Sequence, residues 1–198
     1  MTKLWGPLGW ITLHSISVCY PDNPTDADKR ILEEFMNAFG STLACVYCRQ
    51  HFARMFQDYK NKHPEWKQSR HNLFLAIARM HNSVNKRLEK PYPKTVGESL
   101  DMLVRATAYT TPLAFRAKYI EYLLKDWGRQ RGTGQGYGAY QSVLVMQKII
   151  NEYWNPRDVL FQNVELAEGD LLDYVKNVVS QRPSIPKFNL RSLLGKRS

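Results

Sequence analysis

The sequence has little cysteine, no long apolar run and no segment in which apolar and polar residues alternate cleanly. Its 198 residues include only three cysteines, Cys19, Cys45 and Cys48, which excludes a small domain stapled by several disulfides. No apolar stretch approaches the roughly 18 residues that a membrane-spanning helix requires. Because β-branched runs are short and period-two alternation is missing, we expect no β-sheet.

The first residues, 1–7, contain neither an apolar signal core nor a cleavage site. We therefore expect no signal peptide, no membrane contact and a protein that stays where it is made. The formal net charge is +10, and the excess is spread along the chain. A charge of this kind favours a solvated basic surface over a specific nucleic-acid site.

Apolar residues recur at helical spacing, which predicts an all-α protein. The expected helices cover residues 6–20, 26–40, 45–60, 69–88, 95–109, 113–127, 138–154 and 158–181. Residues 134–139 nominally fit a dinucleotide fingerprint, but they follow a helix instead of a strand, so 128–138 is expected to be a flexible loop. We divide the chain into a four-helix unit over 1–95, a helical extension of unknown role over 96–181 and a basic, flexible tail over 182–198.

The segment from Cys45 to Cys48 places two thiols one helical turn apart. At a helix start a thiolate is stabilised by free backbone N–H groups, and thiolate is the nucleophile in disulfide exchange. A redox pair is one interpretation. The alternative is half of a zinc site, completed by His51, Cys19 or another histidine, in a helical interaction module.

Two further blocks contain aromatic, imidazole and amide side chains at helical spacing. Trp10 and His14 are four residues apart, and so are His81 and Asn85, so each pair shares a helix face. Stacking surfaces, hydrogen-bond donors and a nearby Lys90 are what a flat heteroaromatic cofactor with a pyrophosphate requires. Any one of these residues alone is more often a core or capping residue.

Taken together, these blocks resemble the Erv/ALR family of FAD-linked sulfhydryl oxidases over about the first 95 residues. The opening Trp-Gly-Pro-x-x-Trp resembles the branch found in large DNA viruses. The matching residues are Gly6, Trp10, His14, Tyr20, Pro21, Asp22, Pro24, Thr25, Cys45, Cys48, His51, His81, Asn82, Val84, Asn85, Leu88, Lys90 and Pro91.

The resemblance implies a four-helix bundle that holds FAD at its mouth, followed by a short further helix and assembled as a homodimer. A dithiol protein would attack Cys45, Cys48 would lie against the flavin, and molecular oxygen would be reduced to hydrogen peroxide. It also implies a cofactor-binding set consisting of Gly6, Trp10, His14, His51, His81, Asn82, Val84, Asn85 and Lys90. The expected substrate is a thioredoxin-like or viral structural protein, in the host cytoplasm or the virion.

The chain also departs from the family pattern. Pro7 stands where an arginine is common, so the phosphates would be bound by Lys3, Lys86 or Lys90. The family's structural disulfide has no counterpart cysteines, and no second Cys-x-x-Cys is available as a shuttle. Cys19 is expected to be an inert buried thiol, unless it acts on a partner subunit. A basic nucleic-acid-binding helical protein with an incidental cysteine pair is a third hypothesis.

Overall fold

The computed structural model describes residues 2–174, and within them the fold consists of helices and connecting turns without strands. The α-helices are α1 (Thr2–Cys19), α2 (Asp26–Thr42), α3 (Val46–Lys62), α4 (Arg70–Arg87), α5 (Val96–Ala106), α6 (Pro112–Gly128) and α7 (Gly134–Ile149). A π-helical turn, Ile150–Trp154, continues α7. The predicted all-α fold with a helical extension after the first four helices is confirmed.

Local capping explains why several helices begin where the sequence predicts. The Thr25 hydroxyl accepts a hydrogen bond from the Asp28 N–H, and the Asp28 carboxylate accepts one from the Thr25 N–H. The Ser69 hydroxyl caps α4 and the Thr95 hydroxyl caps α5 in the same manner. Each cap satisfies a backbone donor that has no partner inside the helix.

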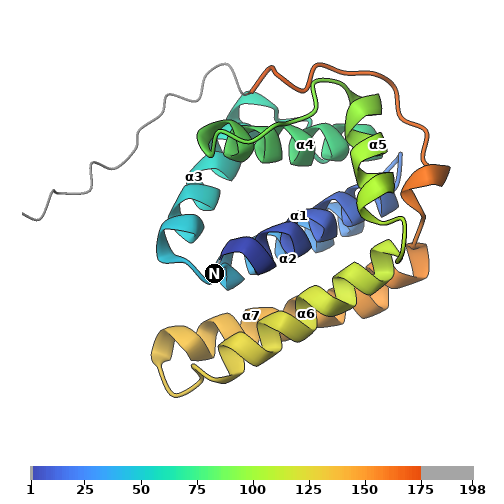
Figure 1. The fold of residues 1–198 in the computed structure, drawn as a ribbon. Helices are drawn as coiled ribbons and strands as arrows, with labels where there is room; N and C mark the ends of the chain where they lie inside the picture. The colour runs from blue at the N-terminus through green and yellow to red at the C-terminus, as the bar shows by residue number, and fades with distance from the viewer. Residues whose placement is uncertain (1, 175–198) are drawn as a thin grey trace, which may run out of the picture.

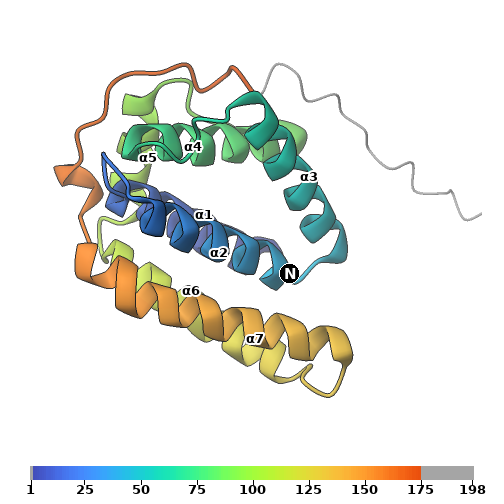
Figure 2. The ribbon, with the colours of Figure 1, turned by 180° about the vertical axis from the view of Figure 1, so that it is seen from behind.

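The helices form stacked layers (Figures 1 and 2). The pair α1 and α2 lies in the middle, α4 lies on one side, and α6 and α7 lie on the other, with α6 against α1 and α7 against α2. Helix α3 closes one end of the stack and α5 the opposite end. The extension therefore covers a whole face of the α1–α2 pair.

Large side chains fill the layer between the extension and the bundle. Tyr119, Trp127 and Trp154 are all buried and belong to the same apolar core as Phe35 of α2. The Trp127 indole N–H donates to the Thr42 carbonyl over 2.8 Å. Since an aromatic side chain buries 150–250 Å² on average, this layer holds the extension firmly on the bundle.

Two parts of the extension differ from the sequence prediction. Residues 158–174, expected to be the first part of a helix, contain only a short 3₁₀ turn, Phe161–Asn163, within an otherwise non-helical path. The remainder of that expected helix, 175–181, and the tail, 182–198, lie outside the described residues. The glycine-rich stretch is not all loop either, because α7 already begins at Gly134 with Thr133 as its N-cap.

Gly136, in the first turn of α7, packs against the backbone of the turn that follows α6. A Cβ atom there would come within 1.9 Å of the Gln130 carbonyl oxygen, so backbone would have to move. We expect Gly136→Ala to lower the free energy of unfolding by about 1–3 kcal/mol, the usual cost of overpacking. Denaturant titration measures the change.

Gly138 provides the matched control in the same helix. Nothing lies within 4 Å of a Cβ built there, and alanine is the better helix former. Gly138→Ala should raise the free energy of unfolding by about 0.5–1 kcal/mol. Equal effects of the two alanines would contradict the close approach at Gly136.

Candidate active site

A cavity of about 430 Å³ lies between α1, α3, α4 and α5. Its size is within the range of roughly 300–1,000 Å³ that is typical of cofactor and small-molecule sites. The predicted site residues that line it are Gly6, Trp10, His14, Cys48, His51, His81, Val84, Asn85 and Lys90. These residues come from three separate stretches of the chain, 6–14, 48–51 and 81–90, which the fold brings together around one cavity.

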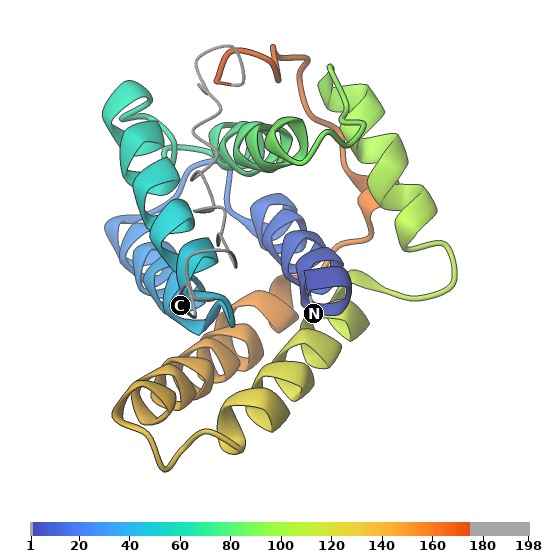
Figure 3. The same ribbon diagram turned by 60° about the vertical axis from the view of Figure 1, so that its left-hand side comes forward.

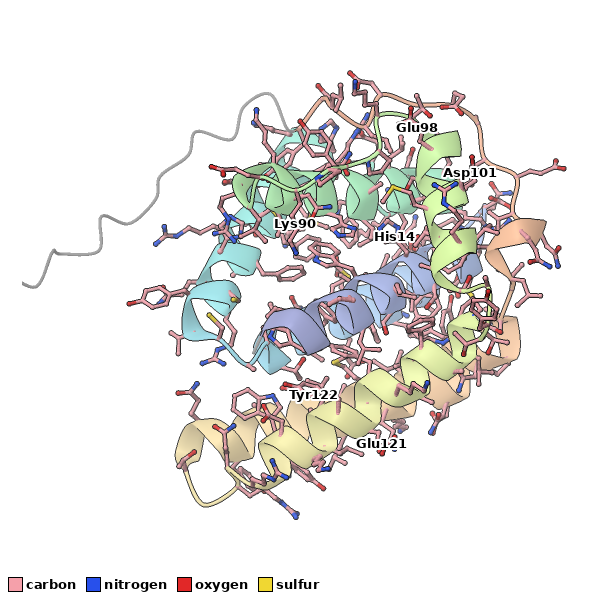
Figure 4. All side chains as sticks on the ribbon, viewed as in Figure 1. His14, Lys90, Glu98, Asp101, Glu121 and Tyr122 are labelled. Carbon is pink, nitrogen blue, oxygen red and sulfur yellow. The ribbon has the colours of Figure 1, made fainter. Side chains whose placement is uncertain are left out.

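An aromatic and imidazole cluster forms the wall shared by α1 and α4. The Trp10 indole stacks on the His81 ring with centroids 4.3 Å apart and planes 8° apart. His14 Nε2 lies 3.2 Å from His81 Nδ1, so one ring donates a hydrogen bond to the other. Figure 4 shows His14 between α1 and α4, and Lys90 beyond the end of α4.

Burial keeps these histidines neutral. It lowers the pKa of His14 well below the usual value, with a further contribution from His81. Burial and the Lys90 charge lower the pKa of His81 to about 4. Burial, together with Arg87 and Arg54, lowers the pKa of His51 to about 4 as well. Neutral imidazoles can each offer a donor and an acceptor to a ligand without adding charge.

The neutral histidines predict a pH dependence of stability. A histidine with a pKa of about 4 when folded and 6.5 when unfolded binds fewer protons in the folded state between those values. The stability that His51 and His81 contribute is therefore complete above pH 6.5 and lost as the pH falls towards 4. We expect the free energy of unfolding to decrease over this window in denaturant titrations.

The His81→Gln variant tests the source of this pH dependence. Glutamine keeps a donor and an acceptor but does not titrate, so the variant should show a shallower decrease between pH 6.5 and pH 4. An unchanged slope would show that His81 is not buried in its neutral form. The exposed Lys118, replaced with glutamine, serves as a control that should leave the slope as it is.

The two thiols of the Cys45–Cys48 pair have different surroundings. Cys45 is the N-cap of α3, and its sulfur accepts a hydrogen bond from the Cys48 N–H over 3.3 Å. Burial raises the pKa of Cys45, but hydrogen bonds from Cys48 and Tyr47 and the Arg49 charge together bring it below the usual value. Burial and the neighbouring Cys45 raise the pKa of Cys48 to about 12. Cys48 lines the cavity, whereas Cys45 does not.

The structure does not place Asn82 in the cavity wall. Its amide nitrogen is buried and donates to the Pro93 carbonyl over 2.7 Å and to the Leu171 carbonyl over 3.3 Å. Asn82 thus ties α4 to the segment before α5 and to the chain near residue 171. Its contact with a cofactor stays a prediction.

One cation and one whole wall of the cavity were not predicted from the sequence. Arg87 lines the cavity and acts electrostatically on both Cys48 and His51. Arg87 lies one helical turn after Val84 on α4, so the sequence already placed it on the same helix face as a predicted cofactor contact. The opposite wall is supplied by α5, through Ser99, Met102, Leu103 and Ala106. Segments before and after residue 95 of the sequence therefore both line the cavity.

The zinc alternative finds no support in the geometry. Within residues 2–174, no three His, Cys, Asp or Glu side chains are grouped closely enough to hold a metal ion. Cys19 is buried at the end of α1, where burial raises the pKa of its thiol. The described helices also include none that is long and apolar enough to cross a membrane.

Comparison with known proteins identifies the family. The model of the Erv1 / Alr family matches residues 8–101. An FAD-linked sulfhydryl oxidase of African swine fever virus is 31% identical over 86 residues, which are 43% of this chain and 69% of that protein. The chain belongs to the Erv1/Alr family. The resemblance inferred from the sequence motifs is thereby confirmed.

Other relatives of this Erv1/Alr protein share the same segment. The mitochondrial FAD-linked sulfhydryl oxidase ERV1 of Saccharomyces cerevisiae is 35% identical over 86 residues, 43% of each chain. A protein of Acanthamoeba polyphaga mimivirus, named as a probable FAD-linked sulfhydryl oxidase, is 38% identical over 84 residues, 41% of this chain and 56% of that protein. The chain thus spans about half the length of these two relatives. No solved structure matches it.

Proposed function

We propose that this protein is an FAD-dependent thiol oxidase that converts a protein dithiol and oxygen into a disulfide and hydrogen peroxide. One observation carries the proposal: Cys48 of the cysteine pair lines the same cavity as the stacked Trp10 and His81. The relatives named as FAD-linked sulfhydryl oxidases support this choice of cofactor and reaction class.

The cavity fits a flavin in the chemistry of its walls. Trp10 and His81 offer flat faces for stacking, and Phe52 and Leu103 add apolar surface. Two buried nitrogen atoms, His14 Nδ1 and Arg87 Nε, have no hydrogen-bond partner among the described residues. Buried polar atoms without partners are costly, so polar groups of a bound ligand would stabilise both.

The proposed cofactor contacts follow from this wall. Trp10, His14 and His81 would hold the aromatic parts of FAD, with Val84 and Asn85 beside them. Arg87 and Lys90 are the cations that line the cavity, and they would bind the phosphates where Pro7 replaces the family's arginine. FAD bound there would supply a two-electron acceptor for the cysteine pair and a two-electron donor to oxygen.

The cysteine pair performs the exchange with substrate. A substrate thiolate attacks the sulfur of Cys45 in the oxidised pair, which breaks the Cys45–Cys48 bond and releases Cys48, with the electron pair of that bond, at the cavity wall. The second substrate thiol, after losing its proton, attacks the mixed disulfide and releases Cys45. Because a thiol of lower pKa is the better leaving group, the lowered pKa of Cys45 favours this second step.

The substrate is proposed to be a dithiol protein, of the thioredoxin-like or viral structural kind, and the working unit a homodimer. Relatives from large DNA viruses support placing the reaction in an infected cell's cytoplasm or in the virion. The described part of the chain offers no second Cys-x-x-Cys as a shuttle. We propose that substrate reaches Cys45 directly; the alternative is a relay through Cys19 of a partner subunit.

The purified full-length protein tests the proposal. Protein from flavin-replete cells should be yellow, release FAD on denaturation and consume oxygen when dithiothreitol is added, with one peroxide formed per disulfide. A colourless, folded protein without oxygen uptake would refute it. Zinc in stoichiometric amount in place of flavin would restore the interaction-module alternative.

A further inference from the structure

We propose that Cys45 lies within a basic docking surface, built jointly by α3 and the α6–α7 turn, that selects dithiol segments flanked by acidic residues. This inference rests on the proposed oxidase function and adds the class of substrate and the role of the extension. The basic rim, as we name it, consists of Arg49, Arg54, Arg129 and Arg131.

Direct contacts bring the α6–α7 turn to the start of α3. Trp127, at the end of α6, donates its indole N–H to the Thr42 carbonyl, three residues before Cys45. The Arg49 guanidinium carbon lies 5.6 Å from the centre of the Trp127 ring. Figure 3, like Figures 1 and 2, shows the turn and the first residues of α3 at the same end of the molecule.

The turn is held in a fixed position. Met146 of α7 lies with its sulfur 3.7 Å from the Thr42 hydroxyl oxygen, so both helices of the hairpin contact the residues that lead into α3. Gly136 permits the close approach that shapes the turn. A rigid neighbour orients charge towards an incoming partner without an added entropic cost.

Charge is distributed unevenly around Cys45. No Asp or Glu occurs in residues 35–57, which contain Cys45, Cys48, Arg49 and Arg54, and none occurs in residues 127–151, which contain Arg129 and Arg131. Trp127, at the start of the second stretch, contacts Thr42 and Arg49 of the first. Glu98 and Asp101, by contrast, lie on α5 at the opposite end of the molecule (Figure 4).

Three of the four side chains of the rim are available to a partner, whereas Arg49 is half-buried and donates to the Leu43 carbonyl. Arg54, Arg129 and Arg131 are exposed, and Tyr47, between the two cysteines, is 76% exposed. Exposed tyrosine beside arginine is the composition that interface centres favour. Because the four arginines outnumber the flanking Asp58 and Asp126, this surface attracts an acidic segment and repels a basic one, which raises the rate of productive encounter.

The charge pattern fits one occupant: an extended segment with a Cys-x-x-Cys core and Asp or Glu on both flanks. One flank would meet Arg54 on α3 and the other the turn that carries Arg129 and Arg131. The core would then present its first thiol to Cys45. The extension, which has no counterpart in the matched residues 8–101, thereby acquires a role in substrate selection.

Two peptides and the flavin-loaded full-length protein test this docking surface. They share a Cys-x-x-Cys core, with glutamates on both flanks in one and glutamines in the other. At 50 mM salt kcat/KM should be about tenfold higher for the glutamate peptide, and the ratio should approach one at 0.5 M salt as charges are screened. Equal values at low salt would overturn the proposal.

Two double variants test whether Arg129 and Arg131 cause the preference for the glutamate peptide. Arg129→Gln with Arg131→Gln should remove most of the glutamate advantage and leave dithiothreitol oxidation unchanged. Arg30→Gln with Lys118→Gln removes the same charge from exposed sites elsewhere and should keep the advantage. Arg129→Gln alone, which leaves the Arg131 contact with Tyr140 in place, should give an intermediate ratio.

The outcomes distinguish a failure of the docking surface from a failure of the oxidase function. A glutamate advantage that survives in Arg129→Gln with Arg131→Gln would overturn the docking surface, while oxygen uptake with dithiothreitol would keep the oxidase function. No uptake with dithiothreitol by the wild-type protein would overturn the oxidase function and the docking surface with it.

Discussion

The Cys48→Ser variant is expected to lose dithiol oxidation by about three orders of magnitude or more, as enzymes do when a covalent catalytic group is removed. Serine cannot form the disulfide with Cys45, so no electron pair can pass from substrate towards the cavity. The cavity wall keeps its shape because one sulfur is replaced by an oxygen. Bound flavin should therefore stay with the protein, measured by its absorbance, while oxygen uptake disappears.

Cys19→Ser is the matched control for this prediction. Cys19 is buried at the end of α1 and belongs to the core instead of the cavity wall. Its replacement should lower stability modestly and leave oxygen uptake within about a factor of two, as for a substitution that touches no reacting group. If Cys48→Ser retained turnover, or if Cys19→Ser lost it, the assignment of the redox pair would be wrong.

The parts of the fold that the sequence predicted well have local causes. Helices α2, α4 and α5 begin directly after Thr25, Ser69 and Thr95, and each of these residues caps its helix through its own hydroxyl. A cap involves only neighbours in sequence, so it can be recognised without the fold. The spacing of Trp10 to His14 likewise fixes their shared face.

The failures of prediction involve contacts between distant segments. Residues 158–174 contain apolar residues at spacings compatible with a helix, yet long-range bonds hold most of the segment in a non-helical path. The Glu168 carboxylate accepts hydrogen bonds from the backbone N–H groups of Val96 and Gly97. The Tyr174 hydroxyl donates to the Met55 carbonyl over 3.0 Å. Periodicity within one segment contains no information about such partners.

The α5 wall of the cavity could not be predicted for a similar reason. Leu103 and Met102 belong to an amphipathic stripe, and such a stripe is more often core than ligand site. Only the placement of α5 across the end of the bundle makes it a wall. The absence of Asp and Glu from the stretch around Cys45 is visible in the sequence, but its significance depends on the α6–α7 turn lying beside α3.

A buried arginine joins the extension to the bundle. Arg116 of α6 is fully buried and donates to the Asp158 carboxylate over 2.6 Å, the Asn155 amide oxygen over 3.1 Å and the Ser15 hydroxyl over 3.1 Å. These partners come from α1 and from the chain after α7. The network thus connects three segments of a protein in which the family's structural disulfide has no counterpart cysteines.

Asp158→Asn is expected to cause a large loss of stability. The neutral amide would leave the Arg116 guanidinium buried without a counter-ion, and breaking a buried ion pair in this way costs about 3–5 kcal/mol. At roughly 2–4 °C per kcal/mol for a chain of this size, the midpoint of thermal unfolding should fall by about 6–20 °C. Circular dichroism at 222 nm measures it.

Two comparisons show whether burial is the cause. Asp22→Asn removes the carboxylate of an exposed ion pair with Arg70 and should cost less than about 1 kcal/mol. Arg116→Met combined with Asp158→Asn removes the charge together with its counter-ion, so it should destabilise less than Asp158→Asn alone. Equal losses for Asp158→Asn and Asp22→Asn would mean that water reaches Arg116, and the network would then not hold α6 on α1.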